Sequence, residues 1–294
     1  MASDALEELP GLRRALDEIR SERVRGAAWA AFRAARGIIE DVEAGRDPCS
    51  DPQAVAGAVE AANPSMASLA NVALVVREAC GRGALDQALR RLVGYLARSR
   101  ERLGEAARRV RVSGTLVTIS YSSTVEAAIL AWRGDGVRVV VAESRPGGEG
   151  VELARRLRSA GVPVRVTPDL AAHLAMPGSA ALVFGADTVT RDGCIINKVG
   201  TRLLALAARE HGVPAIAVFE PYKIHPSRAC GEVPLERWTI SIEGWGQESV
   251  PVFDETPPSL VRAALTSEGL AEWGARAAVE AERLHRLFVE YVLG

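Results

Sequence analysis

From residue 115 onward, the chain alternates short runs of β-branched and apolar residues with segments of helical periodicity. Strands that alternate with helices in this way form a parallel sheet with helices on both faces. The pattern therefore predicts a doubly wound α/β domain, which we place at residues 106–294. We expect strands at 115–119, 137–141, 163–166, 180–184 and 214–218, and helices at 122–132, 149–160 and 198–211.

The first 105 residues carry a different pattern. Apolar residues recur at helical spacing after Arg25-Gly26 and again after Asn63-Pro64-Ser65, a typical helix start. We therefore predict a small N-terminal helical domain at residues 1–105, followed by a Rossmann-like sheet domain. Towards the other end of the chain, a sixth strand is expected at 238–242 and a C-terminal helix at 268–291.

Composition and charge exclude several classes of function. The chain has 294 residues, with 36 basic against 37 acidic side chains, so it offers no polycation for a nucleic-acid backbone. The N-terminal residues lack the pattern of a secretion signal, and no apolar run reaches the length of about 18 residues that favours a membrane helix. We therefore expect a cytoplasmic protein with no membrane partner and no direct nucleic-acid partner.

The sequence has four cysteines, Cys49, Cys80, Cys194 and Cys230, and no two of them have C-x-x-C spacing. So few cysteines in a chain of this length favour reduced thiols over a disulfide framework or a zinc site. The dinucleotide pattern G-x-G-x-x-G and the P-loop are both absent from the sequence. We therefore expect no metal and no cofactor.

Polar residues follow several of the expected strands. A hydroxyl cluster that includes Ser120, Ser122 and Ser123 follows the first strand and opens a helix, where it either binds an anion or simply caps the helix. Arg145 follows the second strand and Asp187 the fourth. Ligands of doubly wound sheets bind beyond the carboxyl ends of the strands, so these residues are candidates for a binding site.

Lysine is scarce, since 34 of the 36 basic residues are arginine. Of the two lysines, Lys198 lies in the first turn of the helix expected from Ile196, where a cation opposes the helix dipole unless a bound anion neutralises it. Lys223 follows the fifth strand and reaches the same edge of the sheet. Unless this placement arose by chance, the two lysines predict a site for a small phosphorylated molecule.

Several motifs in the same order resemble the family that contains the alpha, beta and delta regulatory subunits of translation initiation factor 2B. This family also contains the methylthioribose-1-phosphate and ribose-1,5-bisphosphate isomerases. Residues 24–28 are similar to its N-terminal phosphate loop and residues 64–69 to its second ligand-binding segment. The other matching segments are residues 143–146, 185–189, 193, 197–201 and 251–258.

In the isomerases, a cysteine and an aspartate move hydrogen between C1 and C2 of the sugar. The resemblance implies that Asp187 is this aspartate, and it places Ser120 in the position of the cysteine. Asn63 stands where the isomerases carry an arginine. The phosphate- and sugar-binding positions implied by the resemblance are Arg25, Gly26, Ala27, Ala28, Asn197, Lys198 and Lys223.

An alcohol supplies almost no alkoxide near neutral pH, whereas a thiol with a pKa near 8.5 readily supplies thiolate. We therefore expect a regulatory protein that binds a sugar phosphate or a nucleotide, and not a working enzyme. One alternative is an isomerase of ribose 1,5-bisphosphate or methylthioribose 1-phosphate, with a water held by Ser120 or the thiol of Cys194 replacing the missing cysteine. Another is a structural paralogue with an empty pocket.

The resemblance also implies how the chain assembles. Members of this family form dimers through the α/β domain, so we expect a homodimer of this kind, with a higher oligomer as its extension. An initiation-factor subunit is the partner that the resemblance favours.

Overall fold

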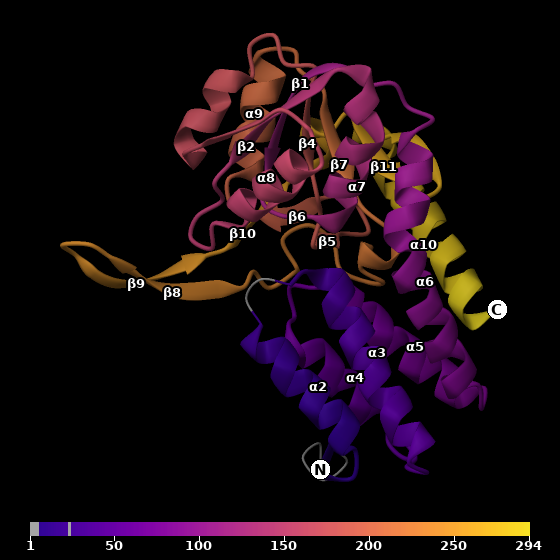
Figure 1. Ribbon diagram of the computed structural model, residues 1–294. Helices are drawn as coiled ribbons and strands as arrows, with labels where there is room; N and C mark the ends of the chain where they lie inside the picture. Colours follow the sequence, from indigo (N-terminus) through magenta and orange to yellow (C-terminus); the bar gives the residue numbers. More distant parts are fainter. Residues whose placement is uncertain (1–5, 23–24) are drawn as a thin grey trace.

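In the computed structural model, residues 6–22 and 25–294 are described. The N-terminal part consists of helices that surround one apolar core, to which Leu12, Ile38 and Leu89 contribute buried side chains. Figure 1 shows these helices as one body beneath the sheet. Their bounds are α2 (Pro10–Ser21), α3 (Ala27–Glu43), α4 (Pro52–Ala62), α5 (Ala67–Gly81) and α6 (Leu85–Ala107).

The second part is built on a seven-stranded sheet with the spatial order β12-β11-β7-β4-β1-β2-β3. Neighbouring strands are parallel except β11 and β12. The expected doubly wound sheet is therefore confirmed, and its order reverses between β1 and β4, where such folds bind ligands. The strands are β1 (Gly114–Ile119), β2 (Val137–Ala142), β3 (Val164–Thr167), β4 (Ala181–Phe184), β7 (Ala215–Val218), β11 (Ala263–Thr266) and β12 (Gly269–Glu272).

Helices cover both faces of this sheet. Because side chains alternate along a strand, Val117 packs into one core with Phe184, whereas Leu116 packs into the other with Trp132. The C-terminal helix α10 also reaches the N-terminal helices, where its Phe288 is buried in their core. The covering helices are α7 (Ser123–Trp132), α8 (Glu149–Ser159), α9 (Thr201–Glu210) and α10 (Ala277–Leu293).

Two smaller sheets complete the architecture. A three-stranded antiparallel sheet has the order β10 (Phe253–Thr256), β6 (Ile195–Lys198) and β5 (Thr188–Val189). A separate hairpin of β8 (Arg237–Ile242) and β9 (Gly246–Pro251) projects from the body of the molecule as a long arm (Figure 1). Within the described residues, no helix has the length and apolar character that crossing a membrane requires.

Three local predictions are wrong. Lys198 ends strand β6 and does not lie in a helix, because Gly200 has a left-handed φ of 102° and α9 begins only at Thr201. The strand at 238–242 exists but pairs only with β9, so it is not part of the main sheet. The helix expected from residue 268 begins at Ala277, since the preceding residues form the antiparallel edge strand β12.

The expectation of reduced thiols is also wrong. Disulfides join Cys49 to Cys80 and Cys194 to Cys230, so all four cysteines are paired. Each pair is far apart in sequence, by 31 and 36 residues, and the fold brings the Cα atoms to 5.4 and 5.6 Å. Sequence spacing alone does not reveal such proximity. No cysteine of the chain, Cys194 included, is then available as a thiol.

Candidate active site

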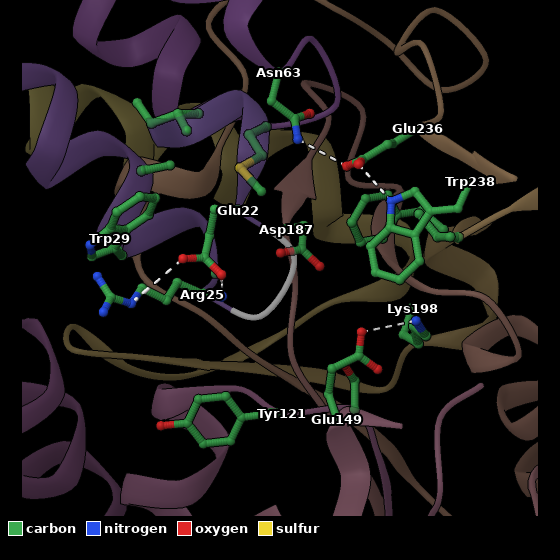
Figure 2. A pocket seen from close by; sticks show the side chains of 17 residues that line it. Glu22, Arg25, Trp29, Asn63, Tyr121, Glu149, Asp187, Lys198, Glu236 and Trp238 are labelled. Atoms are coloured by element: carbon green, nitrogen blue, oxygen red, sulfur yellow. Dashed lines mark hydrogen bonds and ion pairs between the residues drawn. The ribbon is translucent and has the colours of Figure 1, made fainter. Parts of the chain in front are cut away.

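A cleft lies where the order of the main sheet reverses, between the ends of β1 and β4 and the N-terminal helices. It consists of two adjoining cavities that share Arg25, Gly26, Trp29, Tyr121 and Asp187. We call the cavity that also contains Lys223 the basic end, and the cavity that also contains Glu149 and Glu236 the acidic end. Figure 2 shows the side chains that line the acidic end, which come from the N-terminal helices and from the segments around the sheets.

Two helix N-termini face the basic end. Helix α3 begins at Ala27 directly after Gly26, and α7 begins at Ser123, whose neighbour Ser122 accepts a hydrogen bond from the Val125 N–H at 3.5 Å. The first N–H groups of a helix lack partners within it and carry its positive dipole end. The structure therefore brings Gly26, Ala27, Ala28, Ser122 and Ser123 together in one place suited to an anion.

Gly185 allows this arrangement. It follows β4, and a Cβ atom built on it would lie 2.8 Å from Cβ of Ser122, which is too close for any side chain. Only glycine lets the end of β4 approach the start of α7 this closely.

Ser120 lies in the cleft directly after β1, in a strained conformation. Its φ of 66° is uncommon for a residue other than glycine, and its N–H is held by a 2.7 Å hydrogen bond to Oγ of Ser144. Ser144 has a φ of 73°, and its own N–H donates to Asp169 Oδ1 at 2.6 Å. Strained backbone of this kind clusters at functional sites, where the surrounding contacts maintain it.

Asp187 lies at the junction of the two ends of the cleft, between β4 and β5. Burial is the main cause that raises the pKa of its carboxyl group, and the nearby carboxylates of Glu149 and Glu236 raise it further. The ammonium groups of Lys223 and Lys198 oppose this increase. A carboxyl group with a raised pKa is suited to exchanging a proton with a ligand.

Lys223 is buried, and its Nζ donates a 2.6 Å hydrogen bond to the Ala186 carbonyl beside Asp187. Burial lowers the pKa of this lysine, while the carboxylates of Asp187 and Glu220 act in the opposite direction. Asn197 also lines the basic end, where its amide donates to Thr201 Oγ1 at 2.9 Å. Both predicted binding residues therefore lie against the same cavity.

Lys198 lies at the acidic end and is almost completely buried. Its Nζ is 3.1 Å from Glu149 Oε1 and 5.2 Å from the centre of the Trp238 ring. The other oxygen of Glu149, Oε2, is buried without a hydrogen-bond partner. Lys198 is thus neutralised by a carboxylate of its own chain.

Asn63 and Trp238 both donate hydrogen bonds to Glu236 at the acidic end. The Asn63 amide reaches Oε2 at 2.9 Å, and the Trp238 indole reaches Oε1 at 2.7 Å (Figure 2). The arm β8–β9 begins at this point, so its base forms one wall of the cleft.

Among the predicted site residues, Arg145 lies apart from the others. It is exposed, its Nε donates to Glu143 at 3.2 Å, and it lines neither cavity. Asp187, Ser120 and the other predicted site residues line the cleft. Val24 of the predicted phosphate loop lies outside the described residues.

Sequence reasoning missed the carboxylates of the acidic end. Glu149 could have been found, because it opens the helix that follows the second strand. Glu236 gave no signal, since its partner Asn63 is 173 residues away in the sequence.

The cleft combines two helix N-termini, a carboxyl group with a raised pKa and a serine in a strained turn. Comparisons with known proteins show which family the chain resembles. A Pyrococcus abyssi protein named as translation initiation factor eIF-2B subunit 2-like is 33% identical over 263 residues, covering 87% of this chain and 94% of that protein. The ribose 1,5-bisphosphate isomerase of Haloferax volcanii is 33% identical over 290 residues, covering 88% of each chain.

The crystal structure of translation initiation factor eIF-2B from Pyrococcus horikoshii matches the fold with a TM-score of 0.80. The two sequences are 30% identical, and the match covers 89% of this chain and 96% of that one. Residues 23–272 match the model of the initiation factor 2 subunit family. The chain therefore belongs to the initiation factor 2 subunit family.

Proposed function

We propose that this chain is a regulatory member of its family, which binds a phosphorylated sugar or a nucleotide in the cleft without isomerising it. One observation carries the proposal: Ser120 occupies the position that the resemblance assigns to the isomerases' cysteine, and every cysteine of the chain is in a disulfide. Losing one acid-base group commonly costs a factor of about 10² to 10⁴ in rate.

The basic end supports binding of a phosphate group. One cavity is lined by two helix N-termini, by two cations and by two hydroxyl groups. The cations are the Arg25 guanidinium and the Lys223 ammonium, and the hydroxyl groups belong to Ser122 and Ser123. Backbone N–H groups at helix starts and nearby cations are the usual means by which proteins hold phosphate.

The isomerase is the second candidate, because a carboxyl group remains at the position of the isomerases' aspartate. Asp187 has a raised pKa and lies in the same cavity as Ser120, so a proton could be exchanged through a water between them. The Haloferax volcanii relative is named for this activity. Only a turnover assay separates the two candidates.

We further propose that the chain acts through assembly in the cytoplasm. It forms a homodimer through the α/β domain, and this dimer assembles into a higher oligomer. An initiation-factor subunit is its protein partner. Exposed leucines on neighbouring elements of this domain support the dimer. Leu170 and Leu174 on the short helix Asp169–Ala175 are 81% and 72% exposed, and Leu203 on α9 is 61% exposed. An apolar patch of this kind is typical of protein interfaces.

Calorimetric titration with ribose 5-phosphate tests the binding. We expect Lys223→Met and Arg25→Met to weaken it at least tenfold, whereas Arg145→Met, which removes a cation outside the cleft, leaves it unchanged. Arg25 is exposed, so its replacement does not endanger the fold. Equal loss in all three variants, or no binding to the wild type, contradicts the proposal.

Incubation with ribose 1,5-bisphosphate tests the catalytic alternative. The wild type should form ribulose product more slowly than about one turnover per second, a typical enzymatic floor. Ser120→Cys should raise the rate, because it places a thiol in the same cavity as Asp187. Faster turnover by the wild type would establish the isomerase instead.

A further inference from the structure

The two ends of the cleft differ in charge. Among the described residues, the acidic and basic side chains that line the acidic end are four carboxylates and two cations, namely Glu22, Glu149, Asp187, Glu236, Arg25 and Lys198. At the basic end they comprise Arg25, Lys223 and Asp187, and two helix N-termini add partial positive charge. A ligand in this cleft therefore meets opposite potentials at its two ends.

The cations of the acidic end already have partners. Lys198 contacts Glu149 at 3.1 Å, and Nε of Arg25 lies 3.6 Å from Glu22. Lys198 is therefore already paired with a carboxylate, whereas Arg25 is 61% exposed and also lines the basic end. At the basic end, the Lys223 ammonium donates its hydrogen bond to a neutral carbonyl oxygen.

The neutral donors of the acidic end are occupied as well. The Asn63 amide and the Trp238 indole N–H each donate to one oxygen of Glu236, at 2.9 and 2.7 Å. Glu236 is held in place by these bonds, and its backbone N–H donates to Ser65 Oγ at 2.8 Å. A carboxylate fixed in this way accepts hydrogen bonds from a ligand and repels an anion.

We propose that the cleft selects a phosphomonoester whose end opposite the phosphate is uncharged and donates hydrogen bonds to Glu236, and that it discriminates against sugar bisphosphates. This inference rests on the proposed function, since it assumes that the basic end holds a phosphate. A second phosphate would lie among the carboxylates of the acidic end. Like charges a few ångströms apart at a partly buried site weaken binding by about tenfold or more.

Ribose 5-phosphate and ribose 1,5-bisphosphate are the matched probes, because they differ only in the second phosphate. In calorimetric titrations, we expect the wild type to bind the monophosphate at least tenfold more tightly. Glu236→Gln removes the charge and keeps the size of the side chain, although its one amide oxygen accepts from Asn63 or from the Trp238 indole and no longer from both. The ratio of the two affinities should therefore shift at least fivefold towards the bisphosphate. Combining it with Asn63→Arg should favour the bisphosphate outright.

Glu143→Gln is the control, since it removes a carboxylate that contacts Arg145 outside the cleft, and it should leave the ratio unchanged. Equal or tighter binding of the bisphosphate by the wild type overturns this inference and leaves the proposed function intact. If neither sugar phosphate binds at millimolar concentration, the proposed function fails and this inference fails with it.

Discussion

The ion pair of Lys198 and Glu149 is buried, and this burial predicts how much the free energy of unfolding falls when one partner is removed. The lysine side chain is 3% exposed and the glutamate 15%, and their charged atoms are 3.1 Å apart. Removing one partner of a buried pair leaves an uncompensated charge and costs about 3–5 kcal/mol, whereas replacing both by apolar residues of similar size is often neutral. Lys198→Met should therefore destabilise the protein by about 3 kcal/mol, and Glu149→Met by a similar amount.

A double-mutant cycle measures the coupling between the two residues. Urea denaturation at pH 7, followed by circular dichroism, should place the double variant within about 1 kcal/mol of the wild type. The exposed pair Asp86 and Arg90, four residues apart on α6, is the control and should show no measurable coupling. If the two single losses simply add to within about 0.5 kcal/mol, the buried ion pair does not exist as described.

Three further predictions concern stability. Asp254→Ala removes the carboxylate that accepts N–H groups at the start of α9, so thermal unfolding should report a loss of about 1–2 kcal/mol, which Asp254→Asn largely restores. Burial raises the pKa of Glu220 from 4.5 to about 7, so its contribution to stability is complete below pH 4.5 and is lost as the pH rises through 7. Glu220→Gln should accordingly stabilise the protein by about 3 kcal/mol at pH 8 and leave it unchanged at pH 4, and equal effects at both values would refute this. Thiol titration of the unreduced, denatured chain should find no free cysteine, and four titrated thiols would contradict the pairing. Replacing Cys194 and Cys230 by serines should lower the free energy of unfolding by about 3–4 kcal/mol, as expected for a closed loop of 36 residues.

The main sheet could be predicted from the sequence because each of its central strands is a local signal. A run such as residues 137–141 is apolar and β-branched, and it is followed by a helical period, so the pattern needs no knowledge of distant residues. The edge strand β12 could not be predicted in this way. Its four residues, Gly269–Glu272, include good helix formers, and only pairing with β11 makes them a strand.

The candidate site was predictable as far as it depends on strand ends and helix starts. Ser120, Ser122 and Asp187 follow strands that converge on one edge, so their proximity follows from the topology. The environment of Lys198 was not predictable, because the left-handed turn at Gly200 ends the strand before the helix begins. The contact between Asn63 and Glu236 depends on how the arm meets the helical domain.

A crystal soaked with ribose 5-phosphate locates the bound phosphate group directly. We expect this group at the basic end, within hydrogen-bonding distance of the first N–H groups of α3 and α7 and of the Lys223 ammonium. The opposite end of the sugar should point towards Glu236. Phosphate density among the carboxylates of the acidic end, or bound sugar phosphate outside the cleft, would show that the basic end is not the phosphate site.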